Sequence, residues 1–146
     1  MHLAQFDIVK PKFPKSDSRM DAFYSSTKYI NDLAERQPGF VWREAEEDLE
    51  VLEELWGRGY LYTLSVWKDV NSLKNFLYRT PHVEFMQRGK EWFELIFRPQ
   101  VVMWWIPEDT LPTLREAHDR MVLLYEQGPS YQAFDLKNSS IPVSIY

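Results

Sequence analysis

The sequence predicts an α+β fold of the ferredoxin-like type, with the element order βαββαβ and one extra helix at the C-terminal end. Short runs of β-branched and aromatic residues alternate with segments of helical periodicity, and capping and turn residues separate them. The length of 146 residues suits one domain with one core. We therefore expect a single domain over residues 1–129, followed by a tail over residues 130–146.

The first half of the chain provides three strands and one helix. Residues 3–9 alternate between apolar and polar positions, which is typical of a half-buried strand. Asp17 is a candidate N-cap for a helix that ends at the Gln37-Pro38-Gly39 stop signal. Residues 40–44 and 60–67 are rich in aromatic and β-branched side chains and predict the second and third strands.

An acidic segment separates the second and third predicted strands. Six carboxylates fall between Glu46 and Glu54, in either a long acidic hairpin loop or an inserted helical turn. A calcium loop would need alternating Asp or Asn ligands around a central Gly, and this segment has no such pattern. We expect a solvated acidic segment without a metal.

The second half predicts a helix pair, a strand and a last helix. Asp69 caps a helix that should end near Arg79, because Pro81 disfavours helical geometry at the preceding residue. A second helical piece starts at Pro81. The apolar run at residues 101–106 indicates a strand buried on both faces. Thr113 and Glu116 form the capping box of the last helix, which should end at Gly128-Pro129.

The predicted sheet leaves one face to be covered if its helices all lie on the other face. The strands place large aromatic residues on alternate faces, so neither face suits water. A homodimer, sheet against sheet, would cover the second face. The tail carries two short apolar pieces, Ala133-Phe134 and Ile141-Pro142-Val143, which could pack on its own subunit or on the partner.

Composition and charge exclude several classes of function. The net charge is −5 without a basic run, so binding to nucleic acid or to an anionic membrane is not expected. The chain has no cysteine, which excludes disulfides, thiolate nucleophiles and iron–sulfur clusters. It has neither a signal-peptide pattern nor eighteen consecutive apolar residues, so we expect a cytoplasmic protein. The three histidines are far apart in the sequence, so we do not expect a metal site.

His82 is the leading candidate for a catalytic residue. It lies in an apolar, aromatic context, whereas His2 is at the chain end and His118 is expected on the polar side of the last helix. An imidazole exchanges protons readily near neutral pH, which suits a general acid or base. Tyr78 and Arg88 flank it as candidate catalytic groups, a hydroxyl donor and a clamp for an oxyanion.

Each of these residues also has a structural interpretation. His82 could be a buried imidazole bonded to a backbone carbonyl, and Arg88 could form a salt bridge with Glu84, four residues earlier. Sequence spacing alone does not show that the three residues converge.

The abundance of aromatic residues suggests a cavity for a flat, apolar ligand. The chain has six Trp, eight Tyr and nine Phe, which fill a core or line a pocket. Gln5 and Asp7, on the first strand, are weaker candidates for polar groups in that cavity. The predicted substrate-binding residues are Trp67, Phe85, Trp92, Trp105, Phe23 and Gln5.

The stretches SVW, LKNFLYRTPHVEF, RGKEWF, VVMWWIP and PTLREA resemble the DUF3291 family of the dimeric α+β barrel superfamily, over nearly the whole chain. Trp67, Leu73 and Thr80-Pro81-His82 are more distantly similar to antibiotic-biosynthesis monooxygenase-like domains. The resemblance implies a homodimer with a pocket between sheet and helices in each subunit. Haem-degrading members carry their iron ligand about one turn beyond the Pro-His position, where this chain has Gln87.

These observations lead to one functional hypothesis and two alternatives. The first is a cofactor-independent enzyme of the monooxygenase, cyclase or isomerase type, in which His82 moves a proton of a hydrophobic, aromatic or enolisable substrate. The second is a dimeric ligand-binding or stress-response protein without catalysis. The third is a haem-binding or haem-degrading protein, which Gln87 counts against.

Overall fold

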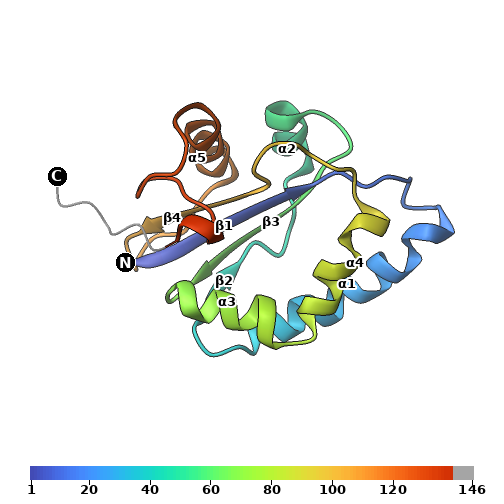
Figure 1. The fold of residues 1–146 in the computed structure, drawn as a ribbon, viewed down its shortest axis with the longest axis horizontal. Coiled ribbons are helices and arrows are strands. Elements are labelled where there is room, and N and C mark those ends of the chain that lie inside the picture. The colour runs from blue at the N-terminus through green and yellow to red at the C-terminus, as the bar shows by residue number, and fades with distance from the viewer. Residues whose placement is uncertain (140–146) are drawn as a thin grey trace.

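A four-stranded antiparallel sheet lies between two groups of helices in the computed structural model, which describes residues 1–139 (Figure 1). Its strands are β1 (His2–Val9), β2 (Phe40–Arg43), β3 (Leu61–Trp67) and β4 (Val101–Ile106). Their spatial order is β2-β3-β1-β4, and every neighbouring pair is antiparallel. The predicted α+β fold with ferredoxin-like order is confirmed.

Five α-helices and two short 3-10 helices join these strands within the described residues. They are η1 (Ser18–Met20), α1 (Asp21–Glu35), α2 (Leu49–Trp56), α3 (Val70–Arg79), α4 (His82–Trp92), α5 (Leu114–Gln127) and η2 (Leu136–Asn138). None of the helices in this part of the chain has the length and apolar character needed to cross a bilayer.

Two of the three predicted caps form, with one change at the last helix, whereas Asp17 caps the 3-10 helix η1 through the Arg19 N–H and not α1 itself. The Asp69 carboxylate accepts a hydrogen bond from the Ser72 backbone N–H at 2.8 Å, and Thr113 Oγ1 accepts one from the Glu116 N–H at 3.1 Å. The reciprocal half of the predicted capping box is not found. The Glu116 carboxylate instead accepts from the Trp104 indole at 3.2 Å and so satisfies a buried donor of the sheet.

The acidic segment becomes the helix α2, the second of the two structures that its sequence left open. The Asp48 carboxylate caps α2 through the Val51 N–H at 3.2 Å. Leu52 is buried on one side of this helix, whereas Glu50 and Glu53 are exposed on the other. An amphipathic helix of this kind adds a layer to the fold as well as negative charge to the surface.

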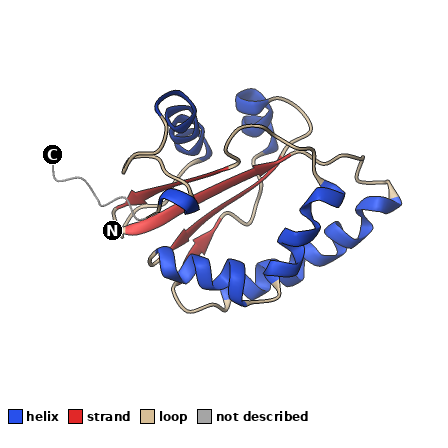
Figure 2. Cartoon of the chain, viewed as in Figure 1, coloured by secondary structure: helices blue, strands red, loops and turns tan. Residues whose placement is uncertain are grey.

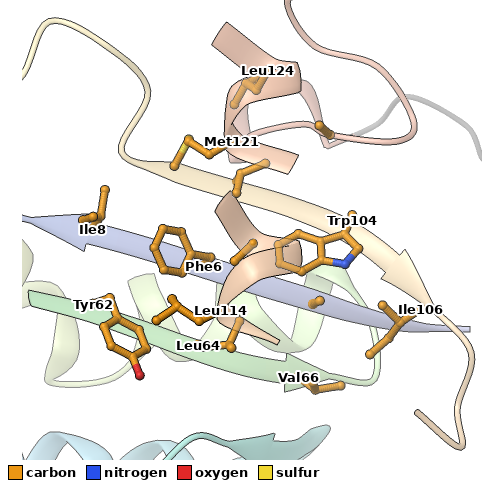
Figure 3. Close-up of a cluster of buried hydrophobic side chains, with 14 of the residues drawn as sticks. Phe6, Ile8, Tyr62, Leu64, Val66, Trp104, Ile106, Leu114, Met121 and Leu124 are labelled. Carbon is orange, nitrogen blue, oxygen red and sulfur yellow. The ribbon is translucent and has the colours of Figure 1, made fainter. Parts of the chain in front are cut away.

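Helices α2 and α5 cover one face of the sheet (Figure 2). The even-numbered residues of β1 point into this layer and meet Leu114, Met121 and Leu124 of α5 (Figure 3). Phe6 and Trp104 have no exposed surface there. The expectation of an uncovered sheet face is therefore wrong, because the chain's own helices pack on it, and the homodimer itself stays a prediction.

Helices α1, α3 and α4 lie on the opposite face (Figure 2). Phe134 and Leu136 of the tail pack into the same cluster of apolar side chains. Phe134 and Met103 exchange two backbone hydrogen bonds, at 2.7 and 3.0 Å, which fasten the tail beside β4 of the same chain. Ala133 and Phe134 are fully buried. The second apolar piece of the tail, Ile141-Pro142-Val143, lies outside the described residues.

The turn between α1 and β2 depends on a glycine. Gly39 has φ +84°, and a Cβ added there would lie 2.5 Å from Ser72 Cβ and still closer to its hydroxyl. Gly59 has a similar φ of +89°, but the nearest atom to an added Cβ is the flexible end of Lys10 at 3.7 Å. The two glycines therefore share the backbone requirement and differ in the available space.

We expect Gly39→Ala to lower the free energy of unfolding by roughly 2 to 4 kcal/mol, because it adds overpacking to an unfavourable φ. Gly59→Ala should cost about 1 kcal/mol, since only the backbone term applies. Urea denaturation of both variants measures the difference, and equal losses would show that contact with Ser72 is unimportant.

Candidate active site

A cavity of about 250 Å³ lies between the sheet and helices α1, α3 and α4. Gln5 and Asp7 of the inner strand β1 line it, next to Thr63, Ser65 and Trp67 of β3. The apolar part of its wall includes Ile30, Phe40, Trp67, Leu73, Phe76, Leu77, Met86, Val101 and Leu136. The polar part is nearly as large and consists of Gln5, Asp7, Asn31, Arg43, Glu44, Glu47, Tyr62, Thr63, Ser65 and His82, so the cavity combines apolar walls with groups that can orient a ligand.

His82 enters the cavity from the first turn of α4. Thr80 Oγ1 accepts a hydrogen bond from the His82 backbone N–H at 3.2 Å, and the imidazole packs 4.7 Å from the Phe76 ring. The ring nitrogen Nδ1 lies 3.4 Å from the Leu77 carbonyl oxygen. Because a carbonyl oxygen only accepts, Nδ1 carries the proton and Nε2 keeps its lone pair.

The surroundings of His82 favour its neutral form. Burial lowers the pKa of the imidazole below its ordinary value, and the hydrogen bond to the Leu77 carbonyl opposes this only in part. His82 thus combines a fixed tautomer with a free basic nitrogen at neutral pH. The structural and catalytic interpretations of His82 are compatible, because Nδ1 bonds to the backbone carbonyl and Nε2 is left for a substrate.

Asp7 is the second titratable group of the cavity. It lies on the central strand between Thr63 and Val101, and its pKa is raised to about 7 because burial disfavours the charged carboxylate. Among residues 1–139 no cation or hydrogen-bond donor offsets this cost. The side chain keeps some exposed surface because it borders the cavity. Asp7 therefore exchanges its proton near neutral pH.

A short hydrogen-bond chain orients two of the cavity residues. The Trp67 indole donates to Ser65 Oγ at 2.9 Å, and the Ser65 hydroxyl donates to Gln5 Oε1 at 2.8 Å. All three side chains are buried. The chain uses the carbonyl oxygen of the Gln5 amide, which leaves the amide NH₂ as a donor beside the cavity.

Acidic residues gather where the cavity meets the loop after β2. Glu44 accepts a hydrogen bond from the Tyr62 hydroxyl, while Glu47 lies nearby in the lining. Burial and this hydrogen bond raise the pKa of Tyr62 well above its usual range. The one arginine of the lining, Arg43, is paired with Glu35 at 2.7 Å. The electrostatic character of the cavity is therefore acidic.

The structure brings three of the predicted site residues into this cavity, namely His82, Trp67 and Gln5. Tyr78 and Arg88 lie outside its lining and are exposed, so the three predicted catalytic side chains do not converge. Arg88 forms its ion pair with Glu91 at 3.0 Å, in place of the predicted Glu84, and its guanidinium stacks over Trp92. Pro81 breaks the helix between these residues, which separates their directions.

The other predicted substrate-binding residues pack elsewhere. Phe23 of α1 meets Trp92 and Phe93 at 5.6 and 5.0 Å, and Phe85 lies 5.9 Å from Trp92, so these rings join α1 to α4. Trp105 lies beside Phe134 of the tail at 6.2 Å. These rings serve the packing of helices and tail, the structural role that the sequence also allowed.

Two polar residues of the cavity, Asp7 and Ser65, were given little or no role by the sequence analysis. Asp7 was a weak candidate because the sequence does not reveal how deeply a strand carboxylate lies. Ser65 was missed altogether, although it is a small polar residue on the same strand face as Trp67. Polar residues on the inward face of a strand were the signal that could have found both.

The described residues were also compared with what a metal ion or a haem would need. Across residues 1–139 no group of three or more His, Asp or Glu side chains is placed to hold a metal ion. Haem, the alternative cofactor, fits the cavity poorly, because about 250 Å³ is below the usual range for a drug-sized ligand and a porphyrin is larger still.

A model of the DUF3291 family, described as a domain of unknown function, matches residues 2–144. The chain belongs to the DUF3291 family. The resemblance seen in the sequence is thereby confirmed. No match is found among curated proteins.

Solved structures are similar to this DUF3291 protein at low sequence identity. MupZ from Pseudomonas fluorescens is 14% identical with a TM-score of 0.50, and the match covers 90% of this chain and 84% of that one. PA3566 from Pseudomonas aeruginosa is 12% identical with a TM-score of 0.48, covering 70% and 88%. SnoaB from Streptomyces nogalater, a cofactor-independent oxygenase, is 15% identical with a TM-score of 0.47, covering 77% and 98%.

Asp7 should make stability depend on pH. Its folded pKa of about 7 exceeds the ordinary value of 3.8, so ionisation costs folding energy as pH rises from 4 to 7. Asp7→Asn should therefore raise the free energy of unfolding by roughly 2 to 4 kcal/mol at pH 8, after allowance for solvent in the cavity.

The gain should shrink toward pH 4, because this pH is close to the unfolded pKa of 3.8 and the two states then differ little in their protonation. Urea denaturation of both proteins between pH 4 and pH 8 measures it. A gain that is independent of pH would contradict the raised pKa.

Proposed function

We propose that this DUF3291 protein is a cofactor-independent enzyme that abstracts a proton from a small, apolar, enolisable or phenolic substrate. One observation carries the proposal: His82 and Asp7 line the same cavity, where burial favours the neutral imidazole and keeps a large share of Asp7 protonated up to about pH 7. A neutral imidazole is a base and a neutral carboxyl is a hydrogen-bond donor. A group that can accept a proton and a group that can donate one, placed in the same cavity, are characteristic of acid–base catalysis.

His82 would act as the base in this reaction. Its Nε2 takes a proton from a C–H next to a carbonyl, or from a phenol, and the bonding electrons move to the substrate oxygen. The Leu77 carbonyl stabilises the resulting imidazolium through the Nδ1–H bond. Returning the proton to the same or another carbon completes an exchange or an isomerisation without a co-reactant.

Asp7 would stabilise the developing oxyanion. In its protonated form it donates a hydrogen bond, and the free amide N–H of Gln5 on the same strand face is a second donor. Donors held in fixed positions in a partly buried cavity stabilise a new negative charge more strongly than water does. Oxygenation, cyclisation and isomerisation all begin with this deprotonation.

The charge of the cavity favours an uncharged substrate. Glu44 and Glu47 add negative potential at its edge, and Arg43 is already paired with Glu35. A substrate carboxylate would be repelled by these groups. The volume of about 250 Å³ and the aromatic walls suit a compound of one or two fused rings.

The proposal is tested with 2-tetralone, an apolar bicyclic ketone with acidic C–H groups. In D₂O the wild-type protein should accelerate exchange of these hydrogens, which proton NMR follows as signal loss. His82→Ala should lower the rate by roughly 10²- to 10⁴-fold, the usual contribution of a general base. Tyr78→Phe and Arg88→Gln should change it by less than about threefold, because both residues lie outside the cavity.

Saturable binding of 2-tetralone without exchange at any pH would contradict catalysis and favour a binding protein. A His82→Ala variant as active as the wild type would remove His82 from the reaction.

The exchange rate should also depend on pH in a way that separates the two groups. It should rise with pH as His82 loses its proton at a pKa below the ordinary histidine value, and fall above about pH 7 as Asp7 ionises. Asp7→Asn keeps an uncharged donor and should abolish the decline on the alkaline side. A wild-type profile that still rises beyond pH 8 would exclude the proposed role of Asp7.

A further inference from the structure

A second cavity, of about 280 Å³, lies on the opposite face of the sheet. Helices α2 and α5 form two of its sides, and the segment before β4 contributes Ile96 and Arg98. Its lining consists of Ile8, Leu55, Trp56, Tyr60, Ile96, Arg98, His118, Met121, Val122 and Tyr125. The proposed reaction in the first cavity uses none of these residues.

Flat aromatic groups dominate this lining. The Trp56 ring stacks on the buried Phe6 at 4.9 Å with an interplanar angle of 23°. His118 meets Trp56 edge-on, also at 4.9 Å, so it is half-buried and not on the polar side of α5 as the sequence suggested. Tyr60 and Tyr125 provide two further rings. Such walls favour a flat, apolar ligand.

The charged group of this cavity is positive. The Arg98 guanidinium lies 5.0 Å from the centre of the Tyr125 ring, whose hydroxyl donates to the Pro99 carbonyl at 2.9 Å. This arginine has no carboxylate within ion-pair distance among residues 1–139, and the lining itself contains no Asp or Glu. The nearest carboxylate to His118 belongs to Asp119, which points into solvent with 82% of its side chain exposed.

We propose that the second cavity binds a small aromatic carboxylate, with its ring against Trp56 and its carboxylate on Arg98. An exposed arginine–carboxylate pair alone contributes little, so ring burial must supply most of the affinity. The unpaired guanidinium then selects an anion over a neutral compound of the same shape. The two cavities thus differ in the sign of their charge, and the acidic one should reject the same ligand.

The probe for this site is 2-naphthoate, titrated into the full ¹⁵N-labelled chain, with 2-naphthamide as its neutral counterpart. The Trp56 indole N–H signal, assigned from its loss in Trp56→Phe, should shift saturably with 2-naphthoate. The amide should bind at least tenfold more weakly. The Trp67 indole in the first cavity should not shift.

Two substitutions separate the charge from the cavity. Arg98→Gln should weaken 2-naphthoate binding about tenfold and leave 2-naphthamide binding unchanged, whereas Arg36→Gln, at the end of α1, should alter neither. Val122→Phe should weaken both compounds by occupying the space. The absence of a saturable Trp56 shift, equal affinity for the two compounds, or full 2-naphthoate binding by Arg98→Gln would overturn the proposal.

Discussion

The alternation of β1 is the constraint on which the rest of this structure depends. This strand is hydrogen-bonded on both sides, to β3 and to β4, so its register fixes the sheet. Phe6 lies between Leu64 and Val102 on the core face, and Asp7 lies one residue further on the cavity face. Because successive side chains point to opposite faces, a single strand builds the main core and the polar part of the site.

Each group of helices packs on one of these two faces of the sheet. Helices α2 and α5 cover the core face, and the Arg115–Glu54 ion pair at 2.9 Å joins them at the surface. Helices α1, α3 and α4 cover the other face and leave the cavity that His82 enters. The chain therefore supplies helical layers on both faces of its own sheet.

Much of the fold could be predicted from local signals. The periods of two in β1 and the caps at Asp69 and Thr113 specify backbone geometry within a few residues, and the structure contains these elements. The helix α2 was left open because six carboxylates mask its short apolar stripe. Its coverage of the second sheet face is a long-range property, and for that reason the inference of a homodimer from an uncovered face failed.

The site was harder to predict than the fold. His82, Trp67 and Gln5 were predicted because their residue types are conspicuous in an apolar context, and all three line the cavity. Tyr78 and Arg88 were misplaced because Pro81 redirects the chain between them, and sequence distance carries no information about that angle. The importance of Asp7 rests on its burial, which only the packed structure reveals.

The alternation of side chains along β1 also affects how the ligand preference of such a protein can change during evolution. Substitutions at positions 5 and 7 change the polar groups offered to a ligand and leave the side chains at positions 4, 6 and 8 in place. The residues that pack the core and the residues that face a ligand therefore alternate along one strand. Evolution or a designed library can change the cavity residues while the core residues are retained, so the ligand preference can change without loss of the fold.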